Sequence, residues 1–92
     1  SAIMGCPGVA DVAVIGVPDD KWGEGVKALV VPAAGVTIEP ADIVAWARDR
    51  IATYKVPKSI EFIEALPRNP SGKVLRRELR APYWEGRDRA VG

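Results

Sequence analysis

Residues 9–17 form an almost uninterrupted apolar run between Gly8 and Pro18. The run is rich in β-branched side chains, which favour extended backbone. It shows no regular alternation with polar residues, as a strand with one solvated face would. These properties predict a strand that is buried on both faces. Its most prominent side chains are Val12, Val14, Ile15 and Val17.

A polar, turn-rich loop over residues 18–25 separates this run from a second predicted strand, residues 26–31. Two strands joined by such a loop are expected to pair antiparallel. Lys27 is expected to be exposed on the second strand. Trp22 lies in the loop, and we expect its side chain to pack beneath the turn in a structural role, together with Gly23 and Glu24.

A helix is predicted to begin at Pro40, because the first helical turn does not need the N–H that proline lacks. Its pattern continues to Ala52, with one broad apolar face on which Trp46 is a core residue. Arg48 falls outside that face and is therefore expected to be exposed. Residues 55–57 end the predicted helix.

Residues 59–63 alternate as a third strand, with Ile60 and Phe62 pointing inward and Glu61 outward. A short closing helix is predicted over residues 74–79. The sequence of elements predicts an α+β fold, in which a small antiparallel sheet of about three strands is flanked by helices.

Size and composition exclude several classes of protein. The chain has 92 residues, enough for one small domain, and its 48% hydrophobic and 27% charged residues exclude a disordered tail. No apolar run is long enough to span a bilayer. One cysteine, Cys6, and no histidine exclude a disulfide framework, the usual metal sites and histidine-based acid–base catalysis. A lone cysteine fits the reducing cytoplasm, which is the expected location.

The charge is divided unevenly between the two halves of the chain. Residues 1–46 carry a net charge of −4, and residues 47–92 a net charge of +5. The basic half is suited to phosphates, carboxylates or an acidic partner surface. A solvated basic face without a ligand is the alternative interpretation.

A Gly-Lys pair stands in the segment Pro67-Arg68-Asn69-Pro70-Ser71-Gly72-Lys73. A phosphate-binding P-loop would need glycine at Pro67 and a magnesium-binding hydroxyl at Val74, so this is no P-loop. The prolines and Gly72 instead predict a stiff loop that presents Lys73 as a mobile point charge for phosphate or carboxylate oxygens. An ordinary surface lysine in a Pro-Gly turn is the alternative.

Four motifs occur together in this chain: the apolar run continuing to Pro18-Asp19, Trp22-Gly23-Glu24, Tyr54-Lys55-Val56-Pro57, and the lysine loop followed by residues 74–80. In order and spacing they resemble the C-terminal domain of the adenylate-forming acyl-CoA synthetases, a superfamily that includes luciferase and peptide-synthetase adenylation domains. The resemblance extends from Met4 to Arg80. It implies that residues 1–80 are a small α+β lid domain, truncated at its N-terminal side. Gly86 and Gly92 indicate that residues 81–92 are a loosely attached tail.

The resemblance implies an activity in two steps. Such enzymes convert a carboxylic acid and ATP into an acyl-adenylate and pyrophosphate, and then transfer the acyl group to CoA, while the small domain rotates between the steps. Lys73 matches the lysine that enters the active site for adenylation, where it bridges the substrate carboxylate and the α-phosphate. A cation at that position lowers the repulsion between two anions and stabilises the transition state.

The resemblance implies weaker assignments for other basic residues. Arg48 resembles an arginine that contacts the 3′-phosphate of CoA in CoA-using relatives, and a solvated helix arginine is the alternative. Lys55 is a second candidate for CoA binding, or it only interacts with the end of the helix. Arg76, Arg77 and Arg80 are expected at the interface with the larger domain, and phosphate binding is the alternative. Cys6 replaces a histidine of the relatives and is interpreted as a small, partly buried apolar residue.

The resemblance also implies that a large N-terminal domain of the same polypeptide supplies the acyl pocket, the main ATP site and the family's Mg²⁺. We interpret the 92 residues as a fragment that catalyses nothing alone, and we predict no metal site and no nucleic-acid partner. A fatty acid is the expected substrate, with an aryl acid as the alternative. A non-catalytic basic binding module and a scaffold domain without chemistry are the rival functions.

Overall fold

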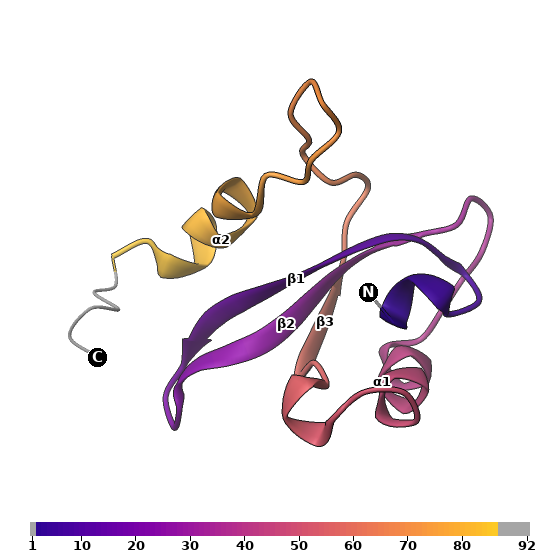
Figure 1. Cartoon of the computed structure of the whole chain (residues 1–92), viewed down its shortest axis with the longest axis horizontal. Helices are drawn as coiled ribbons and strands as arrows, with labels where there is room; N and C mark the ends of the chain where they lie inside the picture. Colours follow the sequence, from indigo (N-terminus) through magenta and orange to yellow (C-terminus); the bar gives the residue numbers. More distant parts are fainter. Residues whose placement is uncertain (1, 87–92) are drawn as a thin grey trace.

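The computed structural model describes residues 2–86 and orders them as a three-stranded sheet with helices on both sides (Figure 1). The elements, in chain order, are η1 (Ala2–Gly5), β1 (Val9–Asp19), β2 (Gly23–Pro32), α1 (Pro40–Arg48), η2 (Thr53–Lys55), β3 (Ser59–Phe62) and α2 (Arg76–Trp84), where η marks a 3₁₀-helix.

The sheet has the strand order β1-β2-β3 and is mixed. Strands β1 and β2 pair antiparallel, with Val12 opposite Val30, which confirms the predicted hairpin. Strand β3 pairs parallel with β2, with Ala28 opposite Ile60, so the third strand does not continue the antiparallel pattern that the sequence predicts. The reason is the intervening helix α1, because a crossover of this kind returns the chain to the end of the sheet from which β2 started. The α+β class is confirmed.

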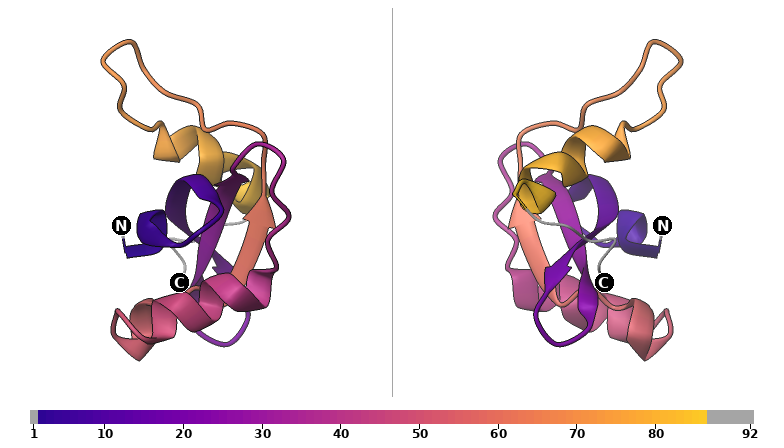
Figure 2. Two further views of the ribbon diagram at one scale, coloured as in Figure 1. Left: turned by 90° about the vertical axis from the view of Figure 1, so that its right-hand side faces the viewer. Right: turned by 90° about the vertical axis from the view of Figure 1, so that its left-hand side faces the viewer.

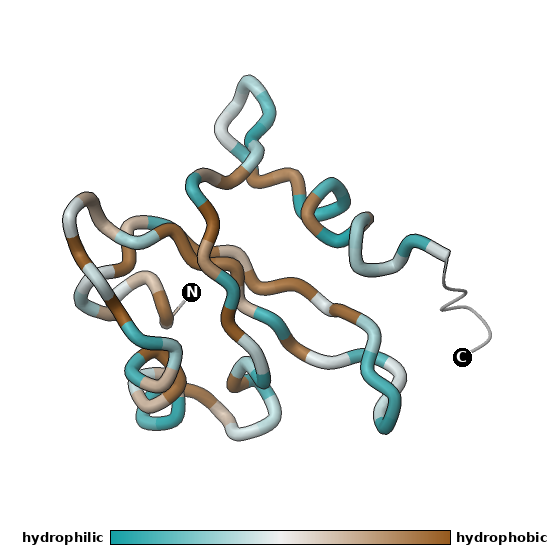
Figure 3. Tube along the Cα trace, turned by 180° about the vertical axis from the view of Figure 1, so that it is seen from behind, coloured by the Kyte–Doolittle hydropathy of each residue, from teal (hydrophilic) through white to brown (hydrophobic). Residues whose placement is uncertain are grey.

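The middle of the β1–β2 hairpin is buried on both faces, as the apolar run predicts for β1. Figure 2 shows α1 on one side of the sheet and α2 on the other, and Figure 3 shows that apolar residues run along the strands between them. Successive side chains therefore enter different cores. The core beneath α1 and η1 contains Ile3, Cys6, Val12, Ala28, Val30, Ile43, Ala47 and Val56. The core beneath α2 contains Ala13, Ile15, Leu29 and Leu66.

The turn between β1 and β2 is closed by a carboxylate. Oδ1 of Asp19 accepts hydrogen bonds from the backbone N–H groups of Lys21 (2.9 Å) and Trp22 (3.0 Å). These bonds, to Trp22 first and then to Lys21, lower the pKa of Asp19. Trp22 is 65% exposed, and its ring lies near the ammonium groups of Lys21 (5.1 Å) and Lys58 (5.6 Å). The prediction that it packs beneath the turn is therefore wrong.

Two side chains of the sheet differ from the prediction. Phe62 is an exposed residue at the end of β3, although Ile60 packs against the core as predicted. Lys27 is only partly exposed, because its ammonium lies 3.3 Å from Oε1 of Glu61 and 5.1 Å from the ring centroid of Tyr83.

Helix α1 begins at Pro40 as predicted but ends at Arg48, four residues before Ala52. The carbonyl oxygen of Ala47 accepts bonds from the N–H groups of both Arg50 (3.0 Å) and Ile51 (2.9 Å), which closes the last turn. Trp46 packs against the core, and its indole N–H donates to the carbonyl of Ala2 at 2.9 Å.

Helix α2 lies later in the chain than the predicted closing helix and includes Ala81–Trp84, the start of the predicted tail. Two aromatic side chains attach it to the sheet. The hydroxyl of Tyr83 donates to Oε1 of Glu61 at 2.7 Å, and the indole N–H of Trp84 donates to the carbonyl of Gly16 at 3.0 Å. Residues 87–92 of the predicted tail lie outside the described residues. Within residues 2–86, no helix is both long and apolar enough to cross a bilayer.

Replacing Val30 by alanine should lower the free energy of unfolding by about 2 kcal/mol, because two buried methyl groups are lost and a cavity remains. Val30 is 0% exposed, whereas Val36 is 43% exposed and provides a matched control. Val36→Ala should change stability by less than about 0.5 kcal/mol. Urea denaturation followed by circular dichroism measures both values, and equal losses would contradict the assignment of the core.

The Tyr83 phenol should make folding sensitive to alkali. Burial, and then the hydrogen bond to Glu61, raise the pKa of Tyr83 to about 12, whereas an unfolded tyrosine has a pKa of about 10. The folded state thus holds this proton more tightly, and the stability it contributes is present below pH 10 and is lost as the pH rises toward 12. Tyr83→Phe should flatten this part of the stability curve. Tyr54→Phe, which changes a 78% exposed ring, should leave it as in the wild type.

Candidate functional site

The lysine loop, residues 67–73, and the two residues after it form a hairpin closed by main-chain hydrogen bonds. The N–H of Leu75 donates to the carbonyl of Pro67 at 2.9 Å, and Arg68 and Val74 form an antiparallel bridge. At the tip, Gly72 has φ +91°, a left-handed conformation in which a β-carbon would be strained. The loop is therefore fixed by hydrogen bonds as well as by its prolines.

Asn69 lies at the centre of this loop. Its Oδ1 accepts hydrogen bonds from the N–H of Ser71 (3.0 Å), the hydroxyl of Ser71 (2.9 Å) and the N–H of Lys73 (2.9 Å). This role of Asn69 was not predicted from the sequence. An asparagine that begins a Pro- and Gly-containing turn is the signal that could have identified it, since such side chains bond to the backbone ahead of them.

Arg68 attaches the loop to the sheet. Its Nη2 lies 2.6 Å from Oδ2 of Asp11 on β1, and its Nη1 donates to the carbonyl of Gly72 at 2.7 Å. One planar guanidinium thus joins the strand to the tip of the loop. This pairing was not predicted, because Arg68 and Asp11 are 57 positions apart in the chain.

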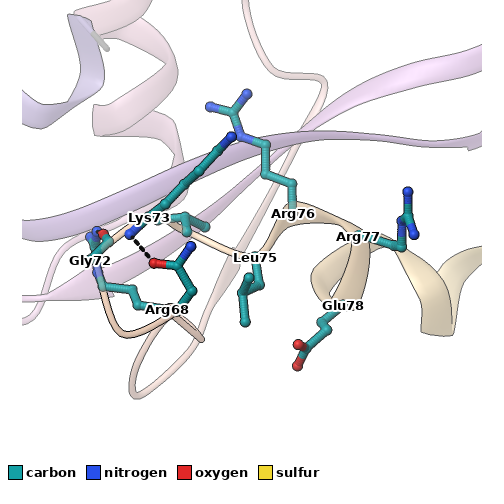
Figure 4. Close-up of a pocket in the computed structure, with 9 residues that line it drawn as sticks. Arg68, Gly72, Lys73, Leu75, Arg76, Arg77 and Glu78 are labelled. Carbon is teal, nitrogen blue, oxygen red and sulfur yellow. Dashed lines mark hydrogen bonds between the residues drawn. The ribbon is translucent and has the colours of Figure 1, made fainter.

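Lys73 is exposed and extends from the loop beside two further cations. In Figure 4 the side chains of Lys73 and Arg76 extend to the same side of the chain, and Glu78 points to the other side. Among the described residues, Lys73, Arg76 and Arg77 have no ion-pair partner. The open hollow between loop and helix is therefore mainly cationic and suits an anionic ligand. Its lining includes Arg68, Lys73, Arg76, Arg77 and Glu78.

Arg48 and Lys55 are exposed, but the structure does not bring them together with Lys73. They belong to the last turn of α1 and to η2, at the opposite end of the molecule from the lysine loop in Figures 1 and 2. The ammonium of Lys55 lies 5.8 Å from the ring centroid of Tyr54, which is 78% exposed. This end of the domain therefore presents cations beside an accessible aromatic ring.

Arg80 differs from Arg76 and Arg77 because it is turned toward the body of the domain. Its guanidinium lies 3.4 Å from Oε2 of Glu24 and 5.6 Å from the ring centroid of Trp84. The carboxylate of Glu24 in turn lies over Gly16, where any side chain would collide with it. Arg80 and Glu24 therefore hold α2 against the hairpin.

No metal centre is found in the described part of the chain, where no three histidine, cysteine, aspartate or glutamate side chains cluster. The Mg²⁺ implied by the resemblance is expected to belong to the N-terminal domain. Cys6 is buried, and this burial raises the pKa of its thiol, which makes a nucleophilic thiolate less accessible.

Known proteins resemble this chain in both sequence and structure. The fatty acid–[acyl-carrier-protein] ligase ScoC of Streptomyces coeruleorubidus is 46% identical over 91 residues, covering 99% of this chain and 18% of the relative. A feruloyl-CoA synthase of an Amycolatopsis species is 55% identical over 81 residues, covering 88% of this chain and 16% of the relative.

A solved structure of a Mycobacterium tuberculosis fatty acyl CoA synthetase superposes with a TM-score of 0.81 at 47% identity, covering 95% of this chain and 17% of that one. The chain thus spans less than a fifth of the length of these relatives. The family model described as "AMP-binding enzyme C-terminal domain" matches residues 1–73, which end at the exposed lysine. The chain belongs to this family of AMP-binding enzyme C-terminal domains.

Proposed function

We propose that the chain is the mobile C-terminal domain of an ATP-dependent acyl-CoA ligase and that it supplies the adenylation lysine. The enzyme would join a carboxylate and ATP into an acyl-adenylate, release pyrophosphate, and transfer the acyl group to the thiol of CoA. The single observation that carries the proposal is Lys73, an exposed cation on a hydrogen-bonded loop beside a cationic hollow.

Lys73 suits the first of these steps. When a carboxylate oxygen attacks an α-phosphate, two anionic groups approach each other and negative charge develops between them. An ammonium between the two groups offsets this repulsion and stabilises the transition state. Because the lysine is carried by a separate small domain, its arrival can also exclude water after the substrates have bound.

The separation of Lys73 from Arg48 and Lys55 supports a second part of the proposal. One end of the domain would serve adenylation, and the opposite end would contact the 3′-phosphate of CoA through Arg48, with Lys55 nearby as a weaker contributor. A rotation of the domain would present these ends in turn to a large N-terminal domain, which would hold the acyl pocket and the main ATP site.

The proposed substrate is a fatty acid, and the proposed compartment is the cytoplasm. The names of the relatives support a carboxylic acid in general, since one acts on fatty acids and the other is a feruloyl-CoA synthase. An aryl acid therefore remains the second candidate. The choice between them depends on the acyl pocket, which this proposal places in the N-terminal domain.

Lys73→Ala in the whole ligase polypeptide should lower carboxylate-dependent ATP–pyrophosphate exchange by at least about 100-fold, since a charge aimed at the transition state is lost. Thioester formation from a supplied acyl-adenylate should persist. Lys21→Ala, which removes an exposed lysine at the distant β1–β2 turn, is the matched control and should leave both activities unchanged. If Lys73→Ala also leaves exchange at the wild-type rate, the proposed function is wrong.

Arg48→Ala should raise the KM for CoA by about 10-fold or more, as expected for loss of a hydrogen bond to a charged phosphate. The effect should disappear when dephospho-CoA, which lacks the 3′-phosphate, replaces CoA. Arg50→Ala removes a neighbouring arginine whose guanidinium is held 3.3 Å from the ring centroid of Trp46, and it should leave the KM for CoA near the wild-type value. An equal rise in KM with both thiols would exclude a contact to that phosphate.

A further inference from the structure

We propose that Asn69 is a positioning residue that fixes the direction in which Lys73 is presented to the reacting groups. This inference rests on the proposed role of Lys73 in adenylation. It adds a residue that acts through the lysine and touches no substrate itself.

Asn69 holds Lys73 by both of its main-chain polar groups. The N–H of Lys73 donates to the side-chain Oδ1 of Asn69 at 2.9 Å, and the N–H of Asn69 donates to the carbonyl of Lys73 at 2.9 Å. The two residues are thus joined by a reciprocal pair of hydrogen bonds. Rotation about the backbone of Lys73 breaks at least one of them, so its Cα–Cβ bond has a fixed direction.

The same carboxamide also orders the chain between the two residues. Ser71 contributes two donors to Oδ1, and the N–H of Gly72 donates to the main-chain carbonyl of Asn69 at 2.9 Å. The loop tip therefore converges on one residue, through both its side chain and its main chain. Because Arg68 joins this tip to Asp11 on β1, the direction set by Asn69 is fixed relative to the sheet.

This arrangement matters because the lysine side chain is long and flexible. Its ammonium reaches a ligand through four methylene groups, so only the base of the side chain can be held by the protein. A change in the direction of the Cα–Cβ bond displaces the ammonium, and a displacement of about 1 Å can lower the rate about 100-fold. A Cα–Cβ bond of fixed direction limits the volume that the ammonium can reach.

A role in folding alone would give different results. Asn69 belongs to neither of the two cores, and the residues that it bonds, Ser71, Gly72 and Lys73, are exposed. Removal of its carboxamide should therefore loosen the loop while the sheet and both helices remain folded. A positioning role predicts a loss confined to adenylation, whereas general destabilisation would affect both half-reactions.

The test uses three variants of the whole ligase polypeptide. Asn69→Ala should lower the kcat of ATP–pyrophosphate exchange by about 10- to 100-fold, with little change in the KM for ATP. Asn69→Thr is the conservative variant and should restore most of the rate, since a threonine hydroxyl makes the same kind of turn bond more weakly. Ser71→Ala removes only one of the donors and should remain near the wild type. Thioester formation from supplied acyl-adenylate should be unchanged in all three.

Hydrogen exchange of the loop peptide, measured by mass spectrometry, provides a readout that does not depend on activity. Amide hydrogen exchange at residues 69–73 should be faster in Asn69→Ala and close to the wild-type rate in Asn69→Thr. A wild-type rate of ATP–pyrophosphate exchange in Asn69→Ala, together with a collapse of this rate in Lys73→Ala, would overturn this inference and leave the proposed function intact. Equal losses in both half-reactions, or no rescue by threonine, would also overturn it. A wild-type rate of ATP–pyrophosphate exchange in both Asn69→Ala and Lys73→Ala would overturn the two proposals together.

Discussion

Burial of both faces of the β1–β2 hairpin determines where every other element lies. Alternate side chains of each strand point into different cores, so a covering layer is needed on each side. Helix α1 with η1 supplies one layer, and α2 with the segment before it supplies the other. The lysine loop emerges between β3 and α2, and its position is therefore a consequence of how the second face is covered (Figure 1).

The body of the domain and the candidate site are stabilised by different forces. The cores depend on the removal of apolar surface from water, which is strong in sum and weakly directional. The lysine loop has little apolar surface to bury and depends on directional hydrogen bonds, many of them converging on Asn69. Such bonds add little net stability each, but they define a geometry. This division allows an exposed segment to be ordered without belonging to a core.

The sequence predicted what composition and periodicity encode, and missed what depends on distant or irregular contacts. The β-branched run identified a strand buried on both faces, and the spacing of Pro67, Pro70 and Gly72 identified an ordered loop carrying Lys73. The direction of β3 was missed, although the predicted helix between the second and third strands was the signal that a crossover makes the third strand parallel. Arg68 and Asn69 were missed for another reason. Their roles come from hydrogen bonds to the backbone and to β1, which leave no periodic pattern in the chain.

Lys73 belongs to the lysine loop and Arg48 to the end of α1, and these two segments lie at opposite ends of one small body (Figure 2). This placement has a kinetic meaning within the proposed function. A rigid domain cannot insert both ends into a single reaction centre, so occupation by one end excludes the other. The acyl-adenylate would then have to survive an interval in which the ammonium has left and the thiol has not yet arrived. The order of the two half-reactions would be enforced by geometry alone, and the lifetime of the mixed anhydride would be set by how fast the domain turns.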